Sequence, residues 1–187
     1  MPKVSQEHLE ARRAEILAGA RRAFAEYGYD GATVARLEQA TGLSRGAIFH
    51  YFSDKKELFV ALAAEVNNRY IELMTTQGLA EAIHELAAES REWLGVLIET
   101  EVRLHHDEDF VRRLEAATAH VREPMLAWFE EQQRLGKLRA DVDPVDLGRF
   151  ATIVINGLAL RVAGGDETNA DAVVRLLGDA LRPQPAA

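Results

Sequence analysis

The apolar residues of this chain recur at intervals of three and four positions. No run of β-branched residues alternates with the period of two that a strand shows, so the pattern predicts an all-α protein. A first helix is expected over about 7–27, with Gly28 as its C-terminal stop. A long helix is expected over about 54–76, because Asp54 and Glu57 form a capping box ahead of an apolar stripe.

Two short helices fit between these long ones. The first starts after the N-cap residue Thr33 and ends at Thr41-Gly42, and the second runs from Ser44 to Phe52. Further helices are predicted at about 79–89, 91–106 and 108–135, from Asp143-Pro144 to Gly164-Gly165, and at about 168–181. Pro124 removes one backbone hydrogen bond from the third of these, so we expect a kink or a break there.

Charge is distributed unevenly along the 187 residues. The chain has 22 Lys and Arg against 30 Asp and Glu, a net charge of −8, but residues 1–56 hold nine basic and seven acidic side chains. The mildly basic N-terminal part and the acidic remainder of the chain indicate two different functions. A polyanion would be bound only by the N-terminal part. We expect an N-terminal domain at 1–53 and a larger helical domain at 54–187.

Composition also excludes several classes of protein. The absence of cysteine excludes disulfide scaffolds and thiolate metal sites. The first ten residues lack the apolar core of a secretory signal. The most apolar stretch, 150–163, is shorter than the roughly 20 residues that cross a bilayer. We therefore expect a cytoplasmic protein with no membrane partner.

The segment from Thr33 to Leu58 has the spacing of a helix-turn-helix. Gly42 suits the sharp turn between two helices of about eight residues. The outer face of the second helix offers an arginine for guanine, small residues for close approach and hydroxyls for phosphate. These features favour DNA binding in the major groove. The alternative is an ordinary helical hairpin with a solvated face.

The stretch from Ile16 to Leu58 resembles the DNA-binding domain of the TetR family of transcriptional regulators. The matching positions are Phe24, Gly28, Thr33-Val34, Thr41 to Ser44, Gly46, Ile48 to Phe52, Lys55 and Leu58. The resemblance implies that Arg45, Ala47 and His50 face bases, that Thr33, Ser44, Tyr51 and Lys55 hold phosphates, and that Gly46 allows close approach.

Two positions depart from the family pattern. Phe49 stands where a phosphate-binding tyrosine is usual, so that contact is expected to be lost or replaced by Tyr51 and His50. Glu38 stands where alanine is usual and is expected to be solvated. Within the family, the segment SRGAIFH is most similar to aconitase-gene repressors of actinobacteria. That resemblance implies a candidate regulon and an effector such as citrate with magnesium.

TetR-family proteins are two-fold dimers, and the C-terminal helices offer a suitable surface. The helix after Pro144 is apolar around nearly its whole circumference, so it needs cover on two sides. We expect a homodimer interface formed by Phe150, Val154, Ile155, Leu158, Val173 and Leu177. The alternative is a central core helix in a monomer.

Charged and polar side chains on apolar helix faces indicate a possible effector pocket. These residues are Arg69, Glu99, Glu101, Arg103, Thr118 and Arg122. A carboxylate ligand could lie between Arg69 and Arg122, since arginine binds carboxylates bidentately. The alternative is internal ion pairing of Arg69 with Glu99 or Glu101.

Nothing in the sequence predicts a metal, a cofactor or catalysis. His105-His106-Asp107 is at a predicted helix end, and adjacent histidines on a helix diverge, so we expect a solvated terminus. No glycine-rich phosphate loop, H-E-x-x-H or G-x-S-x-G motif occurs. The favoured hypothesis is a ligand-responsive regulator, specifically a repressor. The alternatives are a small helical enzyme and a structural helical dimer.

Overall fold

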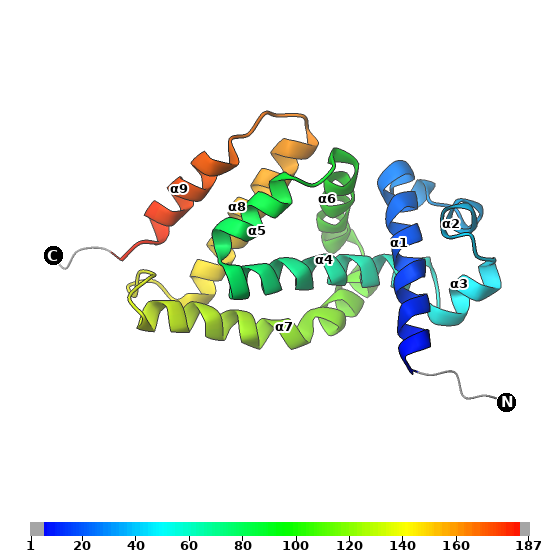
Figure 1. Cartoon of the computed structure of the whole chain (residues 1–187), viewed down its shortest axis with the longest axis horizontal. Helices are drawn as coiled ribbons and strands as arrows, with labels where there is room; N and C mark the ends of the chain where they lie inside the picture. Colours follow the sequence, from blue (N-terminus) through cyan, green and yellow to red (C-terminus); the bar gives the residue numbers. More distant parts are fainter. Residues whose placement is uncertain (1–5, 184–187) are drawn as a thin grey trace. The chain divides into compact units, whose positions relative to one another are not determined.

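The computed structural model describes residues 6–183, except for the side chains of residues 91 and 92, and within this range the chain forms nine α-helices and no strand (Figure 1). The helices are α1 (Gln6–Gly31), α2 (Val34–Thr41), α3 (Arg45–Tyr51), α4 (Lys55–Gln77), α5 (Leu79–Ala87), α6 (Arg91–His106), α7 (Glu108–Arg134), α8 (Pro144–Ala163) and α9 (Ala170–Leu181). The predicted all-α fold is confirmed.

The helices form two compact units. The first unit is the chain up to Glu65 together with Gly95–Ala117, and the second is Val66–Leu94 together with the chain from Thr118 onward. Helices α4, α6 and α7 each contribute residues to both units.

An aromatic cluster forms the core of the first unit. The ring of Phe59 on α4 lies 5.0 Å, centroid to centroid, from the rings of both Phe24 and Tyr29 near the end of α1. Its distance to Phe110 at the start of α7 is 5.8 Å. These aromatic side chains are buried and fasten α1 to α4 and α7, because large rings remove the most apolar area from water.

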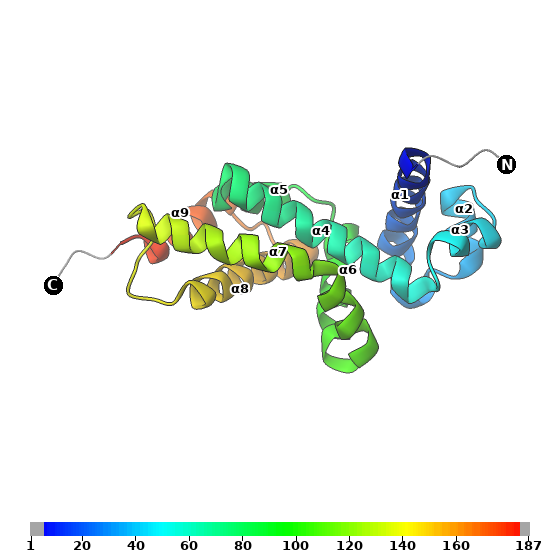
Figure 2. The ribbon, with the colours of Figure 1, turned by 90° about the horizontal axis from the view of Figure 1, so that it is seen from below.

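The helices of the second unit pack around an apolar core of their own. Helix α5 contacts both α8 and α9, which also contact each other. The ring of Phe129 on α7 packs against α8 at Gly148, and both helices are labelled in Figure 2. Ile83, Leu86 and Trp93 are fully buried in this unit.

Helix ends agree closely with the local sequence signals. Gly28 has φ 67° and ψ 175°, which interrupts α1 at the predicted stop. Asp54 accepts the backbone amide of Glu57 at 2.6 Å, and Glu57 reaches back to the amide of Ser53. Asp143 caps α8 by accepting the amide of Val145 at 2.8 Å.

Of the kink or break expected at Pro124, the break does not occur, because α7 continues through this residue. Pro124 is exposed, and the carbonyl that loses its backbone donor can be hydrated at the helix surface. Among the described residues, no helix combines the length and the apolar character needed to cross a bilayer.

Candidate nucleic-acid interface

Helices α2 and α3 are joined by a tightly defined turn. Thr33 and Ser44 cap the two helices by accepting amide hydrogens from Arg36 and Ala47. Gly42 ends α2 in the left-handed conformation, with φ 70°. The hydroxyl of Thr41 donates to a carbonyl of α2 and accepts the amide of Leu43. The angle between α2 and α3 is therefore set by local hydrogen bonds.

Close packing on α1 supports this turn from beneath. Leu37, Ile48 and Phe52 are buried between the helices. Gly19 permits a close approach, because a Cβ there would lie 2.7 Å from Cα of Thr41. Arg22 on α1 donates to the carbonyl oxygen of Ala40 at 2.6 Å. The helix-turn-helix is thus a rigid part of the first unit.

The opposite face of α3 is open to solvent. Thr33, Ser44, Arg45, Gly46 and His50 are exposed, and Ala47, Phe49 and Tyr51 are half-buried. The ring of His50 stands perpendicular to that of Tyr51, 5.3 Å away. The guanidinium of Arg45 forms no ion pair within the described part of the chain, which leaves its donors available for a ligand.

Glu38, expected to be solvated, is only partly exposed and also contacts the start of α3. One carboxylate oxygen accepts the backbone amide of Arg45 at 2.6 Å, and the side chain is half-buried. The interaction spans seven residues and crosses the turn. No spacing rule for single helices reveals such a contact.

The side chain of Lys55 is half-buried in the first unit. Its Nζ donates to the carbonyl oxygen of Tyr29 at 2.9 Å and lies 4.4 Å from the centre of the tyrosine ring. Its pKa is lowered, mainly because burial disfavours the charged form. A phosphate contact by Lys55 stays a prediction, and it would compete with the contact to Tyr29.

Two residues expected in an effector pocket instead hold the end of α1. Glu99 on α6 accepts the amide of Tyr29 at 2.7 Å. Arg103, one turn later, lies 3.8 Å from the centre of the Tyr29 ring and pairs with both Glu99 and Asp30. The pKa of Tyr29 is raised, mainly by burial. Helix α6 therefore binds the segment that precedes the helix-turn-helix.

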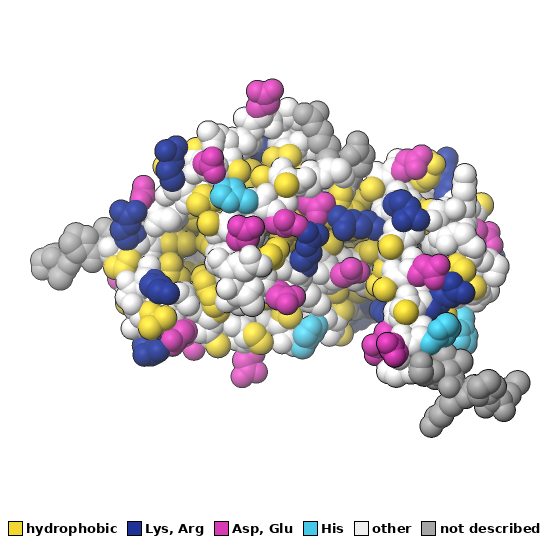
Figure 3. All heavy atoms as spheres, viewed as in Figure 1, with side chains coloured by type: hydrophobic (Ala, Val, Ile, Leu, Met, Phe, Trp, Pro, Cys, Tyr) yellow, Lys and Arg dark blue, Asp and Glu magenta, His cyan; other side chains and the backbone are white. Residues whose placement is uncertain are grey.

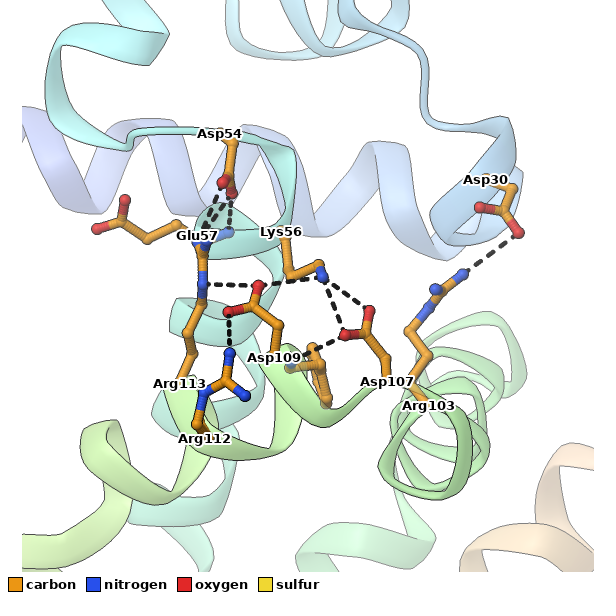
Figure 4. A network of polar contacts seen from close by, with 10 residues as sticks. Asp30, Asp54, Lys56, Glu57, Arg103, Asp107, Asp109, Arg112 and Arg113 are labelled. Carbon is orange, nitrogen blue, oxygen red and sulfur yellow. Dashed lines mark hydrogen bonds and ion pairs between the residues drawn. The ribbon is translucent and has the colours of Figure 1, made fainter.

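A network of ion pairs joins the start of α4 to the start of α7 (Figure 4). Lys56 pairs with Asp107 at 2.9 Å and with Asp109 at 3.1 Å. Arg113 links Asp109 to Asp54. Hydrogen bonds from Lys56 lower the pKa values of Asp107 and Asp109. The network holds the first turn of α4 within the first unit.

The other expected pocket residues are spread over the two units. Glu101 belongs to the first unit and is exposed, whereas Thr118 and Arg122 belong to the second, half-buried and exposed respectively. Arg69 pairs with Glu85 and, at 3.2 Å, with Glu89, so the suggested pairing with Glu99 or Glu101 is wrong.

Arg69 lines an open cavity of about 340 Å³ on α4 and α5. Its other lining residues are Glu72, Leu73, Thr76, Gln77, Glu81 and Glu85. Three carboxylates beside one paired arginine disfavour an anionic ligand at this place. Near the end of α6, His105 and His106 are exposed, and no group of three or more metal-binding side chains occurs among the described residues.

Helices α8 and α9 carry a mixture of buried and exposed apolar residues. Leu158 and Leu177 are 4% and 3% exposed, so both belong to the core of the second unit. Val154, Ile155 and Val173 are half-buried. The large apolar side chains that face solvent on these helices include Phe150, Ile153, Leu160 and Leu176. Ile153 and Leu176 are the most exposed, at 68% and 71%.

This exposed set will be called the α8–α9 apolar face: Phe150, Ile153, Leu160 and Leu176. Figure 3 shows apolar side chains between charged ones on the side of the molecule that α5 faces. Large exposed apolar residues gathered on two adjacent helices are typical of a protein–protein interface.

Comparison with known proteins matches both parts of the chain. Residues 16–62 match the family model described as bacterial regulatory proteins of the tetR family. Residues 75–184 match the model of the C-terminal part of BetI-type transcriptional repressors.

Two curated relatives are similar over nearly their whole length. One is the HTH-type transcriptional repressor Rv1474c of Mycobacterium tuberculosis, 42% identical over 97% of this chain and 99% of that protein. The other is the HTH-type transcriptional repressor AcnR of Corynebacterium diphtheriae, 42% identical over 97% of each chain.

Solved structures share the fold at lower identity. GusR of Salmonella enterica superposes with a TM-score of 0.72 at 21% identity, covering 96% of this chain and 98% of that one. FadR of Bacillus subtilis, solved in complex with stearoyl-CoA, gives a TM-score of 0.70 at 18% identity, covering 90% of this chain and 99% of that one.

Proposed function

The chain belongs to the TetR family of bacterial regulatory proteins, and we propose that it represses transcription as a homodimer whose two α3 helices bind a near-palindromic operator. Members of this family bind operator DNA as dimers and respond to small-molecule effectors. The alternatives of a small helical enzyme and a purely structural dimer are not favoured by relatives that are named as repressors.

The observation that carries the proposal is the exposed face of α3 on a rigid support. Arg45 is exposed, forms no ion pair among the described residues, and starts a capped helix whose opposite side is buried on α1. An arginine in this position can donate two hydrogen bonds to guanine in the major groove. Thr33 and Ser44, which cap α2 and α3, and Tyr51 at the end of α3 add hydroxyl groups suited to phosphate.

Dimerisation is proposed through the α8–α9 apolar face. Two copies that cover Ile153 and Leu176 would remove large apolar side chains from water. A two-fold dimer presents two α3 helices to half-sites about 34–36 Å apart, or a multiple of that spacing. Because operator DNA lies in the bacterial cytoplasm, the proposed function also places the protein there.

The regulated gene and the effector are proposed from the resemblance of the DNA-binding segment. Its similarity to aconitase-gene repressors of actinobacteria supports an aconitase gene as a candidate target and a small carboxylic acid such as citrate as a candidate effector. The ion pairs of Arg69 with Glu85 and Glu89 argue against a carboxylate held by Arg69 in its present arrangement. We therefore do not assign the effector to that cavity.

The test is a gel shift with the full chain at several salt concentrations. The DNA fragments are its own promoter region, the region upstream of an aconitase gene, and a random duplex of equal length. Preferential binding to either genomic fragment, released by citrate with Mg²⁺ or another small acid, is the expected result. Equal binding to all three duplexes would contradict operator recognition.

A further inference from the structure

The hydrogen bond between Glu38 and the amide of Arg45 stabilises the short helix α3 at its first residue. Helix α3 has only seven residues, and a helix of this length is unstable without tertiary support. Its first amides have no partners within the helix. Glu38 accepts the amide of Arg45 at 2.6 Å, whereas the Ser44 hydroxyl accepts that of Ala47 at 3.3 Å. The shorter of these two contacts comes from α2.

Glu38 is well placed to control the direction of α3. Its backbone carbonyl accepts the amide of Gly42, the residue that ends α2. One residue therefore contacts both the turn and the start of the next helix. The contact fixes the backbone of Arg45, the residue proposed to read a base. A small rotation there would move the guanidinium, which lies at the end of a long side chain.

The charge of Glu38 acts separately from its hydrogen bond. The carboxylate has no ion-pair partner among the described residues, and the guanidinium of Arg45 does not contact it. A negative charge close to the DNA-facing helix opposes every phosphate that approaches, whatever the base sequence. The charge alone therefore weakens binding to operator and random DNA together, whereas a loss of helix geometry at Arg45 mainly lowers the preference for the operator.

We propose that Glu38 is a positioning residue for operator recognition, which fixes the first turn of α3 through the amide of Arg45. The proposal rests on the proposed operator-binding function. Through this hydrogen bond, Glu38 should increase the preference of the protein for operator over random DNA. Through its negative charge, it should lower the affinity of the protein for any DNA.

Two matched variants separate the hydrogen bond from the charge. Glu38→Asp keeps the charge but shortens the side chain by one methylene, so the carboxylate no longer reaches the amide. Glu38→Gln keeps the length and an acceptor oxygen but removes the charge. Both changes are mild enough for the fold, which is checked by thermal unfolding. Affinities for the selected operator and for a random duplex are then measured at several salt concentrations.

The two variants should change different quantities: one the ratio of operator to random affinity, the other the affinity for both duplexes. Glu38→Asp should lower the ratio of operator to random affinity by about five- to tenfold, the loss typical of one hydrogen bond, with random-DNA affinity unchanged. Glu38→Gln should keep the ratio within about twofold and raise affinity for both duplexes, as removal of one negative charge predicts.

The outcome that overturns the positioning role is an unchanged ratio in Glu38→Asp. A ratio that falls as far in Glu38→Gln, which keeps the acceptor oxygen, would also overturn it, because the effect would then not follow the hydrogen bond. If the wild-type protein shows no preference for any operator, the proposed function itself fails. In that case hydrogen exchange of the Arg45 amide still tests the contact: protection should fall in Glu38→Asp and persist in Glu38→Gln, and equal protection in both would overturn the contact.

Discussion

The carboxylate of Glu99 accepts the backbone amide of Tyr29 at 2.7 Å, across 70 residues of sequence. Tyr29 follows the interruption of α1 at Gly28 and precedes α2. The contact therefore ties α6 to the segment that carries the helix-turn-helix within the first unit. It also gives a structural role to a residue that the sequence suggested for ligand binding.

Substituting Glu99 by alanine should destabilise the protein. The change leaves the amide of Tyr29 without its acceptor in a partly buried setting and removes a partner of Arg103. An unsatisfied buried amide costs about 1–3 kcal/mol. Urea unfolding at neutral pH measures the loss. Glu101→Ala, an exposed carboxylate on the same helix, is the matched control and should change stability by no more than about 0.5 kcal/mol.

Arg45→Ala should reduce operator affinity by about 1–3 kcal/mol and relax the base preference at one position in each half-site. Its side chain is exposed, so the fold should be unaffected. Quantitative gel shifts with operators altered at single positions measure both effects. An equal loss on operator and random DNA would exclude base reading.

Lys55→Ala provides the contrast to Arg45→Ala. If Lys55 leaves Tyr29 to bind a phosphate, its loss should weaken all DNA sequences similarly and reduce the slope of log affinity against log salt by about one. Because Nζ also donates to the Tyr29 carbonyl, thermal stability should fall as well. A sequence-dependent loss of affinity would contradict the phosphate role.

Ile153→Glu should dissociate the proposed dimer and abolish specific operator binding together. The side chain is 68% exposed, so a charge there is tolerated by the single subunit but opposed at an apolar interface. Light scattering gives the mass and gel shifts give the binding. Leu158→Ala is the comparison: it should cost about 2–5 kcal/mol in stability and leave the folded protein dimeric. An Ile153→Glu protein that stays dimeric would refute this interface.

The ion pairs around Lys56 should contribute stability that depends on pH. The pKa values of Asp107 and Asp109 are lowered in the folded state, chiefly by hydrogen bonds from Lys56. Their contribution is present above the unfolded carboxyl pKa of about 3.9 and is lost as pH falls through the lower folded values.

Lys56→Met should therefore be less stable than the wild type near neutral pH, with a difference that shrinks below about pH 4. Thermal unfolding over a pH series checks this expectation. Lys137→Met, at an exposed site where Lys137 is only the smallest cause of the lowered pKa of Glu131, should show a much smaller pH-dependent difference. A constant difference between wild type and Lys56→Met at all pH values would mean that the carboxylates are not responsible.

Local signals in the sequence were enough to predict the helices and the helix-turn-helix. Capping residues such as Thr33 and Asp143, and the glycine stops, act within a few positions of the chain. The Glu38–Arg45 and Glu99–Tyr29 contacts depend on how helices pack, so periodicity could not reveal them.

The sequence also could not predict which side of α8 faces the core. A helix that is apolar around its circumference does not indicate which residues its own subunit covers. Leu158 and Leu177 satisfied the same pattern as Ile153 and Leu176, yet the first pair is buried and the second exposed. Only the packing of α5, α8 and α9 distinguishes them.

Selection of bound sequences from a pool of random duplexes tests the central claim most directly, namely that a dimer reads an operator through α3. The full chain is predicted to enrich a near-palindrome whose half-site centres lie about 10 base pairs, or a multiple of that, apart. The Arg45→Ala protein should enrich a site that loses its preference at one symmetric pair of positions. Enrichment of an asymmetric site, or no enrichment by the wild-type protein, would contradict the account.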